Sequence, residues 1–241
     1  MTRGNDILQA FLGSLGLRLI RLRYDPVLYS FFFILKERGF VPKHIIDVGA
    51  NHGYWTRAAV KYFPEAYYTL VEPQDHLRTD VQDLLARNYR IHWIGAGAGD
   101  KVGTMPFNIS HRDDSSSFIF AGTRQIKVPV TTLNEIVRTS DAPFPDLVKI
   151  DAEGFDLRVL AGASELVGKT DIFLLEAAIG PQQHFENTLE NVIQTMAHLG
   201  YTIFDIHDLN HGKGGGVLGS CEVAFLRNES HLLDGAYGPS I

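Results

Sequence analysis

From residue 44 onward, short runs rich in β-branched and aromatic residues alternate with longer stretches whose apolar residues recur at helical spacing. This alternation predicts strands joined by crossover helices, and therefore an α/β fold with a mostly parallel, doubly wound sheet. We expect strands over residues 44–48, 67–71, 91–94, 146–150, 171–175, 201–206 and 222–226. We expect helices over residues 54–63, 74–87, 156–167 and 189–199.

Two regions depart from this alternation. The last two expected strands are joined by a glycine-rich loop with no helix, and a parallel pair needs a long crossover. We therefore expect an antiparallel strand at the edge of the sheet. Between residues 99 and 145, short strand-like runs at 105–109, 117–120 and 126–130 predict a small β insertion. A helix over 133–138, capped by Thr131 or Thr132, follows it.

The first forty residues contain two apolar segments with helical character, over 5–22 and 27–38, and Gly39 ends the second. We expect a helical extension over residues 1–40 that packs as a cap on one domain over residues 41–241. A lid, a homodimer face formed by these helices and a membrane-surface contact are the alternatives, and the Phe31-Phe32-Phe33 run makes them worth testing. The apolar stretches within them, over 11–20 and 27–35, are too short for a transmembrane span.

The charge balance argues against a nucleic-acid partner. Asp and Glu number 28 against 22 Lys and Arg, and the formal net charge is −6, whereas proteins that grip a phosphate backbone usually present a basic face. The single cysteine, Cys221, excludes an internal disulfide and a multi-cysteine zinc site. The residue order typical of a signal peptide does not occur at the start of the chain. We therefore expect a cytoplasmic protein.

The segment from Asp47 to Gly53, with the sequence DVGANHG, follows the first expected strand and opens the first helix. A glycine-bearing turn at this place lets a ligand approach the backbone and face the helix N-terminus. Glu72 ends the second expected strand, where an acidic side chain can accept hydrogen bonds from both hydroxyls of a ribose. These features suit either a nicotinamide enzyme or an S-adenosylmethionine (SAM) enzyme.

Asn51 favours SAM over a dinucleotide. It occupies the place of the second glycine in the dinucleotide fingerprint, where a side chain would obstruct a pyrophosphate seated on the backbone. SAM carries no phosphate and presents a charged amino acid end. The Asp47 carboxylate and nearby backbone carbonyls could meet its ammonium group.

Four segments of the chain resemble the FkbM-type methyltransferase family. They occur in the family's order and span roughly residues 44–227, so the first forty residues lie outside the resemblance. The segments are IIDVGANHG at 45–53, VEP at 71–73, VPVTTLNEI at 128–136 and DLVKIDAEG at 146–154, which continues into VLAGA at 159–163.

The resemblance implies a class I SAM methyltransferase fold, which is Rossmann-like, with seven strands of which the last is antiparallel. It also implies O-methylation of a hydroxyl on a sugar, glycan or secondary metabolite, so we expect a small-molecule or glycan acceptor. Asp100 is expected to contact the adenine amino group, and Ser116 to lie over the cofactor. The expected cofactor residues are Asp47, Gly49, Ala50, Asn51, Gly53, Glu72, Pro73, Asp100, Ser116 and Asp151.

A hydroxyl nucleophile needs a base that takes its proton, and that base must lie at the carboxyl edge of the sheet. Asp151 and Glu153 follow the strand at 146–150, Glu176 ends the next strand, and His207 follows the sixth. We expect the catalytic residues among these four. Capping of the following helix is the alternative role of Asp151 and Glu153. His184 and His211 are further candidates for the base.

Other functions stay open. Asp151, Glu153, Glu176 and His207 could supply oxygen and nitrogen ligands to Mg²⁺, although their spacing does not define such a site. The alternative functions are an N-methyltransferase, a nicotinamide oxidoreductase and a non-catalytic binding protein on a methyltransferase fold.

Overall fold

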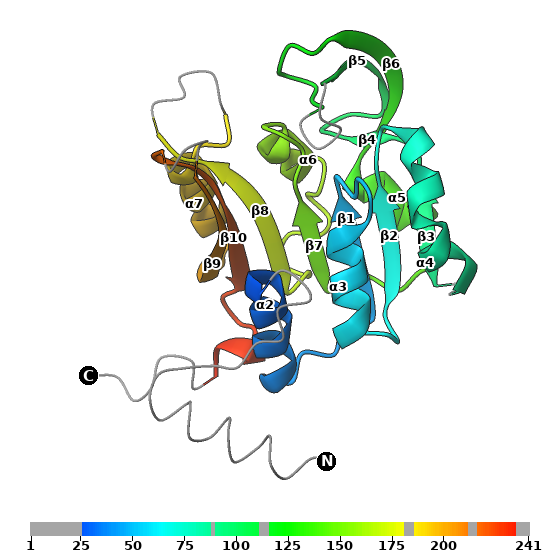
Figure 1. The fold of residues 1–241 in the computed structure, drawn as a ribbon. Coiled ribbons are helices and arrows are strands. Elements are labelled where there is room, and N and C mark those ends of the chain that lie inside the picture. Colours follow the sequence, from blue (N-terminus) through cyan, green and yellow to red (C-terminus); the bar gives the residue numbers. More distant parts are fainter. Residues whose placement is uncertain (1–25, 88–89, 111–115, 181–185, 212–215, 235–241) are drawn as a thin grey trace.

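The computed structural model describes residues 26–87, 90–110, 116–180, 186–211 and 216–234. Its main sheet has seven strands in the order β3-β2-β1-β7-β8-β10-β9 (Figure 1). The strands are β1 (His44–Val48), β2 (Tyr67–Val71), β3 (Ile91–Ile94), β7 (Leu147–Ile150), β8 (Ile172–Ala178), β9 (Tyr201–His211) and β10 (Leu218–Arg227). The strand order reverses between β1 and β7, so the sheet is doubly wound as expected.

β10 is the antiparallel strand, and its position differs from the expected one. It pairs antiparallel with both β8 and β9, and therefore lies inside the sheet while β9 forms the edge. Residues Cys221 to Leu226 are buried without interruption, which suits an interior strand. The second half of β9 is mostly exposed, as expected of an edge strand.

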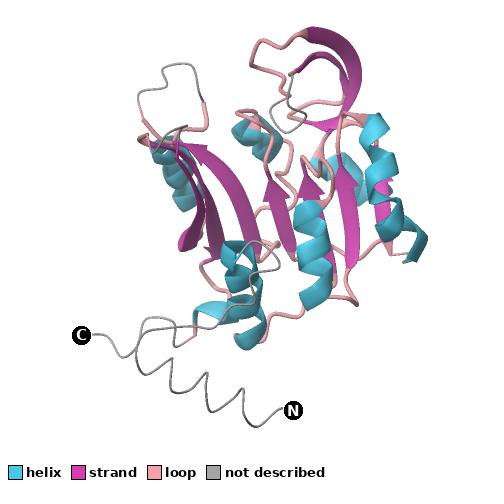
Figure 2. Ribbon diagram, viewed as in Figure 1, coloured by secondary structure: helices cyan, strands magenta, loops and turns pink. Residues whose placement is uncertain are grey.

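Alternate residues of the central strands supply two separate hydrophobic cores, one on each face of the sheet. Ile45 of β1 packs in one core with α2 and α3, and Ile46 packs in the other with α5, α6 and α7. Figure 2 shows these helices covering the sheet. The α-helices are α2 (Pro26–Glu37), α3 (Tyr54–Tyr62), α4 (Gln82–Arg87), α5 (Leu133–Thr139), α6 (Asp156–Ala161) and α7 (Leu189–His198).

Two expected helices are shorter in the structure. The segment 74–87 begins as the 3₁₀ helix η1 (Asp75–Val81) and becomes α-helical only in α4. The segment 156–167 is helical only to Ala161, after which hydrogen bonds such as Ala163 N–H to Leu160 C=O tighten the chain into turns. A second 3₁₀ helix, η3 (His231–Leu233), lies near the end of the described chain.

The β insertion forms a three-stranded sheet in the order β4-β6-β5. Its strands are β4 (Gly97–Ala98), β5 (Gly103–Ile109) and β6 (Arg124–Thr131). The expected strand at 117–120 is reduced to a single bridge between Ser117 and Asn108. Figure 1 shows this small sheet above the carboxyl edge of the main parallel strands, where it can cover a site.

α2 packs on the domain as a cap. Phe31 and Phe32 are fully buried, and the Phe32 ring lies 5.1 Å from that of Trp55, whereas Phe33 is 38% exposed. The expected helix over 5–22 lies outside the described residues. Among the helices that the structure describes, none is long and apolar enough to cross a membrane.

Candidate functional site

The turn between β1 and α3 has a left-handed backbone. Gly49, Asn51 and Gly53 have φ angles of 76°, 47° and 73°. A Cβ on Gly49 would lie 1.9 Å from the backbone oxygen of Asp151, which follows the adjacent strand β7. Glycine is therefore required at position 49 both by its dihedral angle and by the close approach of the neighbouring chain.

Glu72 lies at the end of β2 and binds this turn. Its Oε2 accepts a hydrogen bond from the Asn51 backbone N–H at 3.0 Å, and its Oε1 accepts one from the Gln74 N–H at 2.9 Å. Burial raises the pKa of Glu72, although these two backbone donors oppose the shift. The carboxylate is thus held in one orientation at the wall of a cavity.

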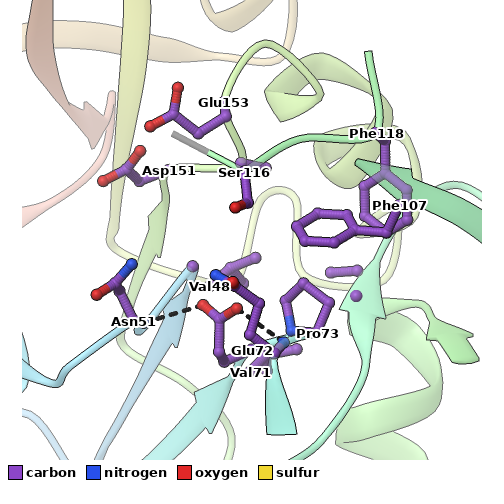
Figure 3. Close-up of a pocket in the computed structure, with 15 residues that line it drawn as sticks. Val48, Asn51, Val71, Glu72, Pro73, Phe107, Ser116, Phe118, Asp151 and Glu153 are labelled. Atoms are coloured by element: carbon purple, nitrogen blue, oxygen red, sulfur yellow. Dashed lines mark hydrogen bonds between the residues drawn. The ribbon is translucent and has the colours of Figure 1, made fainter. Parts of the chain in front are cut away.

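A cavity opens between the carboxyl ends of β1, β2 and β7 and the β insertion; we call it the main cavity. Figure 3 shows Glu72, Asp151 and Glu153 around it, with Phe107 and Phe118 from the insertion. Among the described residues, no Lys or Arg lines it. The lining residues are Val48, Gly49, Asn51, Val71, Glu72, Pro73, Gln74, Gly97, Ala98, Phe107, Ser116, Phe118, Asp151, Ala152 and Glu153.

A buried lysine pairs with Asp151, which lines the main cavity. The Lys149 Nζ lies 2.9 Å from Asp151 Oδ2 and 3.7 Å from Asp47 Oδ1. Burial alone would lower the pKa of Lys149, but the charges of Asp151 and Asp47 raise it above its usual value. Lys149 is therefore a permanent cation that orients Asp151 at the cavity wall.

Asp156, at the start of α6, shapes the loop that follows Asp151. Its carboxylate accepts hydrogen bonds from the backbone N–H groups of Ala152 and Gly154, at 3.2 and 3.1 Å. Within this loop Glu153 has a φ of 49°, a left-handed value that is uncommon for a residue with a side chain. The Ser117 hydroxyl donates to the Glu153 carbonyl at 2.8 Å and ties the loop to the β insertion.

Two further cavities lie next to the main cavity and share Glu176, Asn210 and Ser220 with each other. The acidic cavity is also lined by Asp151, Asp208, Leu209, His211, Cys221 and Glu222. The Asn187 cavity is also lined by Phe120, Glu153, Gly154, Ala178, Asn187 and Gly219. Asp151 and Glu153 therefore each line the main cavity and one of its neighbours.

Two carboxyl groups of these neighbouring cavities have raised pKa values. Burial, reinforced by the charge of Asp151, raises the pKa of Glu176 to about 7. Burial raises the pKa of Glu222 to about 8, although the charge of Lys149 opposes this shift. Carboxyl groups that titrate near neutral pH can accept a proton from a substrate and release it again.

The structure brings together most of the expected site residues. Gly49, Asn51, Glu72, Pro73, Ser116, Asp151 and Glu153 line the main cavity, and Glu176 lines both neighbouring cavities. Ala50 and Gly53 belong to the turn but do not line a cavity. The candidate His184 lies outside the described residues.

Three expected site residues lie elsewhere. Asp47 is fully buried beneath the turn, where its Oδ2 accepts the Thr56 hydroxyl at 2.5 Å, so its side chain does not reach the cavity wall. Asp100 pairs with Arg158 of α6 at 3.0 Å. His207 is buried within β9, because that strand continues to His211; its ring lies 4.8 Å from that of Phe31.

Sequence reasoning missed several residues of the site. Lys149 is the clearest case, because a lysine inside a buried strand is unusual and is a readable signal. Phe107, Phe118 and Asn187 come from the insertion and a loop, where no local pattern indicates a wall of a cavity. Among the described residues, no group of three or more His, Cys, Asp or Glu is arranged to hold a metal ion, so the residues suggested as Mg²⁺ ligands do not form such a group.

The model of the FkbM methyltransferase domain matches residues 47–203 of the chain. A curated relative is the malonyl-[acyl-carrier protein] O-methyltransferase of Neorickettsia risticii (strain Illinois), which is 22% identical over 156 residues. The match covers 55% of this chain and 59% of that protein. The chain therefore corresponds to somewhat more than half the length of this relative.

Solved structures share the fold. A putative O-methyltransferase from Klebsiella pneumoniae superimposes with a TM-score of 0.51 at 14% identity, over 94% of this chain and 91% of that one. A putative hemolysin from Lactococcus lactis gives a TM-score of 0.52 at 14% identity, over 88% of this chain and 92% of that one. At these identities the likeness concerns the fold, which is that of the class I methyltransferases.

Proposed function

Because this chain belongs to the FkbM methyltransferase family and is a SAM-dependent methyltransferase, we propose that it methylates a hydroxyl group of a sugar, glycan or other small metabolite. The carboxylates around the main cavity are the observation that carries this proposal. Glu72, Asp151 and Glu153 line it, and no cationic side chain among the described residues does. This lining favours a ligand with cationic groups and opposes a pyrophosphate.

The residues around the main cavity fit SAM. Glu72 is oriented for the ribose hydroxyls, and Gly97, Ala98, Phe107 and Phe118 offer an apolar slot for the adenine ring. The turn at Gly49 and the Asp151 carboxylate suit the amino acid end. When bound, SAM supplies a methyl group that a nucleophile can take from its sulfonium.

Glu176 is our candidate for the general base. Its carboxyl group lines both cavities beside the main one, and its pKa of about 7 lets it accept a hydroxyl proton at neutral pH. Asp151 is paired with Lys149 at 2.9 Å, which fixes the direction of its carboxylate. We assign Asp151 and Glu153 to orienting the donor and the acceptor.

The test is transfer of a tritium-labelled methyl group from SAM. The purified protein is offered neutral glycosides, an amine-bearing peptide and an RNA, and the product is identified by mass spectrometry. We expect SAM to bind with micromolar affinity in calorimetry, and label to enter the glycosides. Label in the peptide or RNA instead would favour the N-methyltransferase alternative, because an acidic cavity also suits an amine. A folded protein that binds no SAM would overturn the proposal.

A further inference from the structure

Asn187 lines a cavity, and one of its hydrogen-bonding atoms is buried without a partner among the described residues. The residue immediately precedes Thr188, the N-cap of α7, and is 1% exposed. Its Nδ2 donates to Asp156 Oδ2 at 3.1 Å. Its Oδ1 is buried and accepts no hydrogen bond from any residue that the structure describes. A buried amide oxygen without a donor is unfavourable, so a donor that reaches this oxygen would stabilise the site.

Asp156 fixes which way the Asn187 amide points. Both oxygens of Asp156 already accept hydrogen bonds from backbone N–H groups, so the carboxylate presents acceptor atoms to its surroundings. The Asn187 Nδ2 also donates to the Glu176 backbone carbonyl at 3.4 Å, which can only accept, so the amide turns its N–H₂ group toward Asp156 and this carbonyl and its oxygen away from them. The free oxygen belongs to a residue that lines the Asn187 cavity.

The other side chains of the Asn187 cavity restrict the charge of its ligand. Glu153 and Glu176 contribute carboxyl groups, and no Lys or Arg among the described residues lines the cavity. A carboxylate or phosphate ligand would meet like charges, with no compensating cation from the part of the chain that the structure describes. Phe120 adds an apolar wall. This combination suits an uncharged molecule that has both C–H faces and hydroxyl groups.

We propose that the Asn187 cavity binds an uncharged polyhydroxyl acceptor, and that Asn187 recognises it by accepting a hydrogen bond from one of its hydroxyls. This inference rests on the proposed function, because Glu153 lines both this cavity and the main cavity. Asn187 is a specificity residue that binds a hydroxyl beside the reacting one. Asp156 is a positioning residue that orients the amide.

The experiment compares two probes that differ in one group. Methyl β-D-glucopyranoside carries a primary hydroxyl where methyl β-D-glucuronide carries a carboxylate. Binding of each to the protein saturated with S-adenosylhomocysteine is measured by saturation-transfer NMR, and methyl transfer is measured with SAM. We expect the neutral glycoside to bind and to be methylated, and the glucuronide to bind at least about tenfold more weakly.

Asn187→Leu removes the amide oxygen and keeps a side chain of similar size. We expect the KM for the glycoside to rise by about tenfold or more while the affinity for SAM changes less than about twofold. Asn191→Leu is the matched control, because Asn191 is exposed on α7 and donates to the Glu186 carbonyl outside the cavity. If Asn187→Leu does not fold, Asn210→Trp introduces bulk into the same cavity from an exposed position, and should give the same change in KM.

The outcomes separate this inference from the proposed function. A wild-type protein that binds no SAM overturns both. A protein that binds SAM but neither probe overturns the inference alone, and so does equal binding of the glycoside and the glucuronide. An unchanged KM in a folded Asn187→Leu variant also overturns it.

Discussion

The Lys149 ammonium group lies 2.9 Å from the Asp151 carboxylate, and Lys149 is nearly fully buried within β7. The same ammonium lies 3.7 Å from the fully buried Asp47. One cation thus lies between Asp47, which is buried beneath the turn, and Asp151, which lines the main cavity. Charges buried in this way are stabilised only as a group, because each alone would lose its hydration without compensation.

Replacing Lys149 with Met should therefore be strongly destabilising. It would leave Asp47 buried without its cation, and we expect the free energy of unfolding to fall by about 3–5 kcal/mol. Urea unfolding followed by circular dichroism measures this change. Lys127→Met is the control, because Lys127 is exposed on β6. A loss below about 1 kcal/mol in Lys149→Met would show that the buried charges do not depend on one another.

Gly49→Ala should affect both folding and binding of SAM. The new Cβ would lie 1.9 Å from the Asp151 backbone oxygen, and the φ of 76° disfavours any side chain. We expect a loss of about 2 kcal/mol or more in the free energy of unfolding, and a large loss of SAM affinity in calorimetry. Gly103→Ala offers a matched control, since a Cβ there meets nothing within 4 Å. Equal losses of unfolding free energy and of SAM affinity in the two variants would contradict the close packing of the turn after β1 against the residue that follows β7.

Glu72→Gln should weaken SAM binding without unfolding the protein. A glutamine keeps the size of the side chain but removes the charge and presents one N–H₂ group toward the backbone donors of Asn51 and Gln74. We expect at least about a tenfold rise in the dissociation constant for SAM, which corresponds to about 1.4 kcal/mol. Isothermal titration calorimetry provides the measurement. The control is Glu65→Gln, whose side chain is exposed. An unchanged affinity for SAM would show that Glu72 does not contribute to binding the methyl donor.

The proton equilibrium of Glu176 should be visible in the pH dependence of methyl transfer. Below its pKa of about 7 the carboxyl group is protonated and cannot accept a hydroxyl proton, so kcat/KM should fall as the pH falls through that value. Glu176→Gln should lose about 10²–10⁴-fold in kcat, and its residual activity should lack this acid limb. NMR of protein labelled with ¹³C at glutamate side chains can follow the titration directly. A Glu176 signal that titrates near the usual value for glutamate would contradict the assignment.

Phe31 should contribute much more to stability than its neighbour Phe33. Phe31 is fully buried against His207, whereas Phe33 is 38% exposed. We expect Phe31→Ala to lower the free energy of unfolding by about 3–5 kcal/mol, and Phe33→Ala to lower it by less than about 1 kcal/mol. Urea unfolding of the two variants tests whether α2 is part of the domain. Similar losses of unfolding free energy in both variants would show that burial of Phe31 is not what holds α2 on the domain.

Local patterns were sufficient for the elements that carry the donor site. The turn from Asp47 to Gly53 was recognisable because left-handed residues after a buried strand require glycine, and because Glu72 ends the next strand. The alternation of strands and helices predicted the doubly wound sheet, because helices that connect successive strands make those strands parallel. The lysine inside the strand at 147–150 was a readable signal too, because a buried strand rarely contains one.

The sequence alone predicted the class of fold and the loop at which we expect the methyl donor, because both predictions depend on residues close together in the chain. Three other features follow from contacts between distant segments. β10 lies inside the sheet, and Asp47 is buried beneath the turn and does not line the cavity. The His207 ring packs against Phe31 of α2. The hydrogen bond between Asp156 and Asn187, which are 31 positions apart in the chain, is a further contact of this kind. Such pairings depend on how distant segments pack, and a side chain's burial and pKa follow from that packing rather than from its neighbours in sequence.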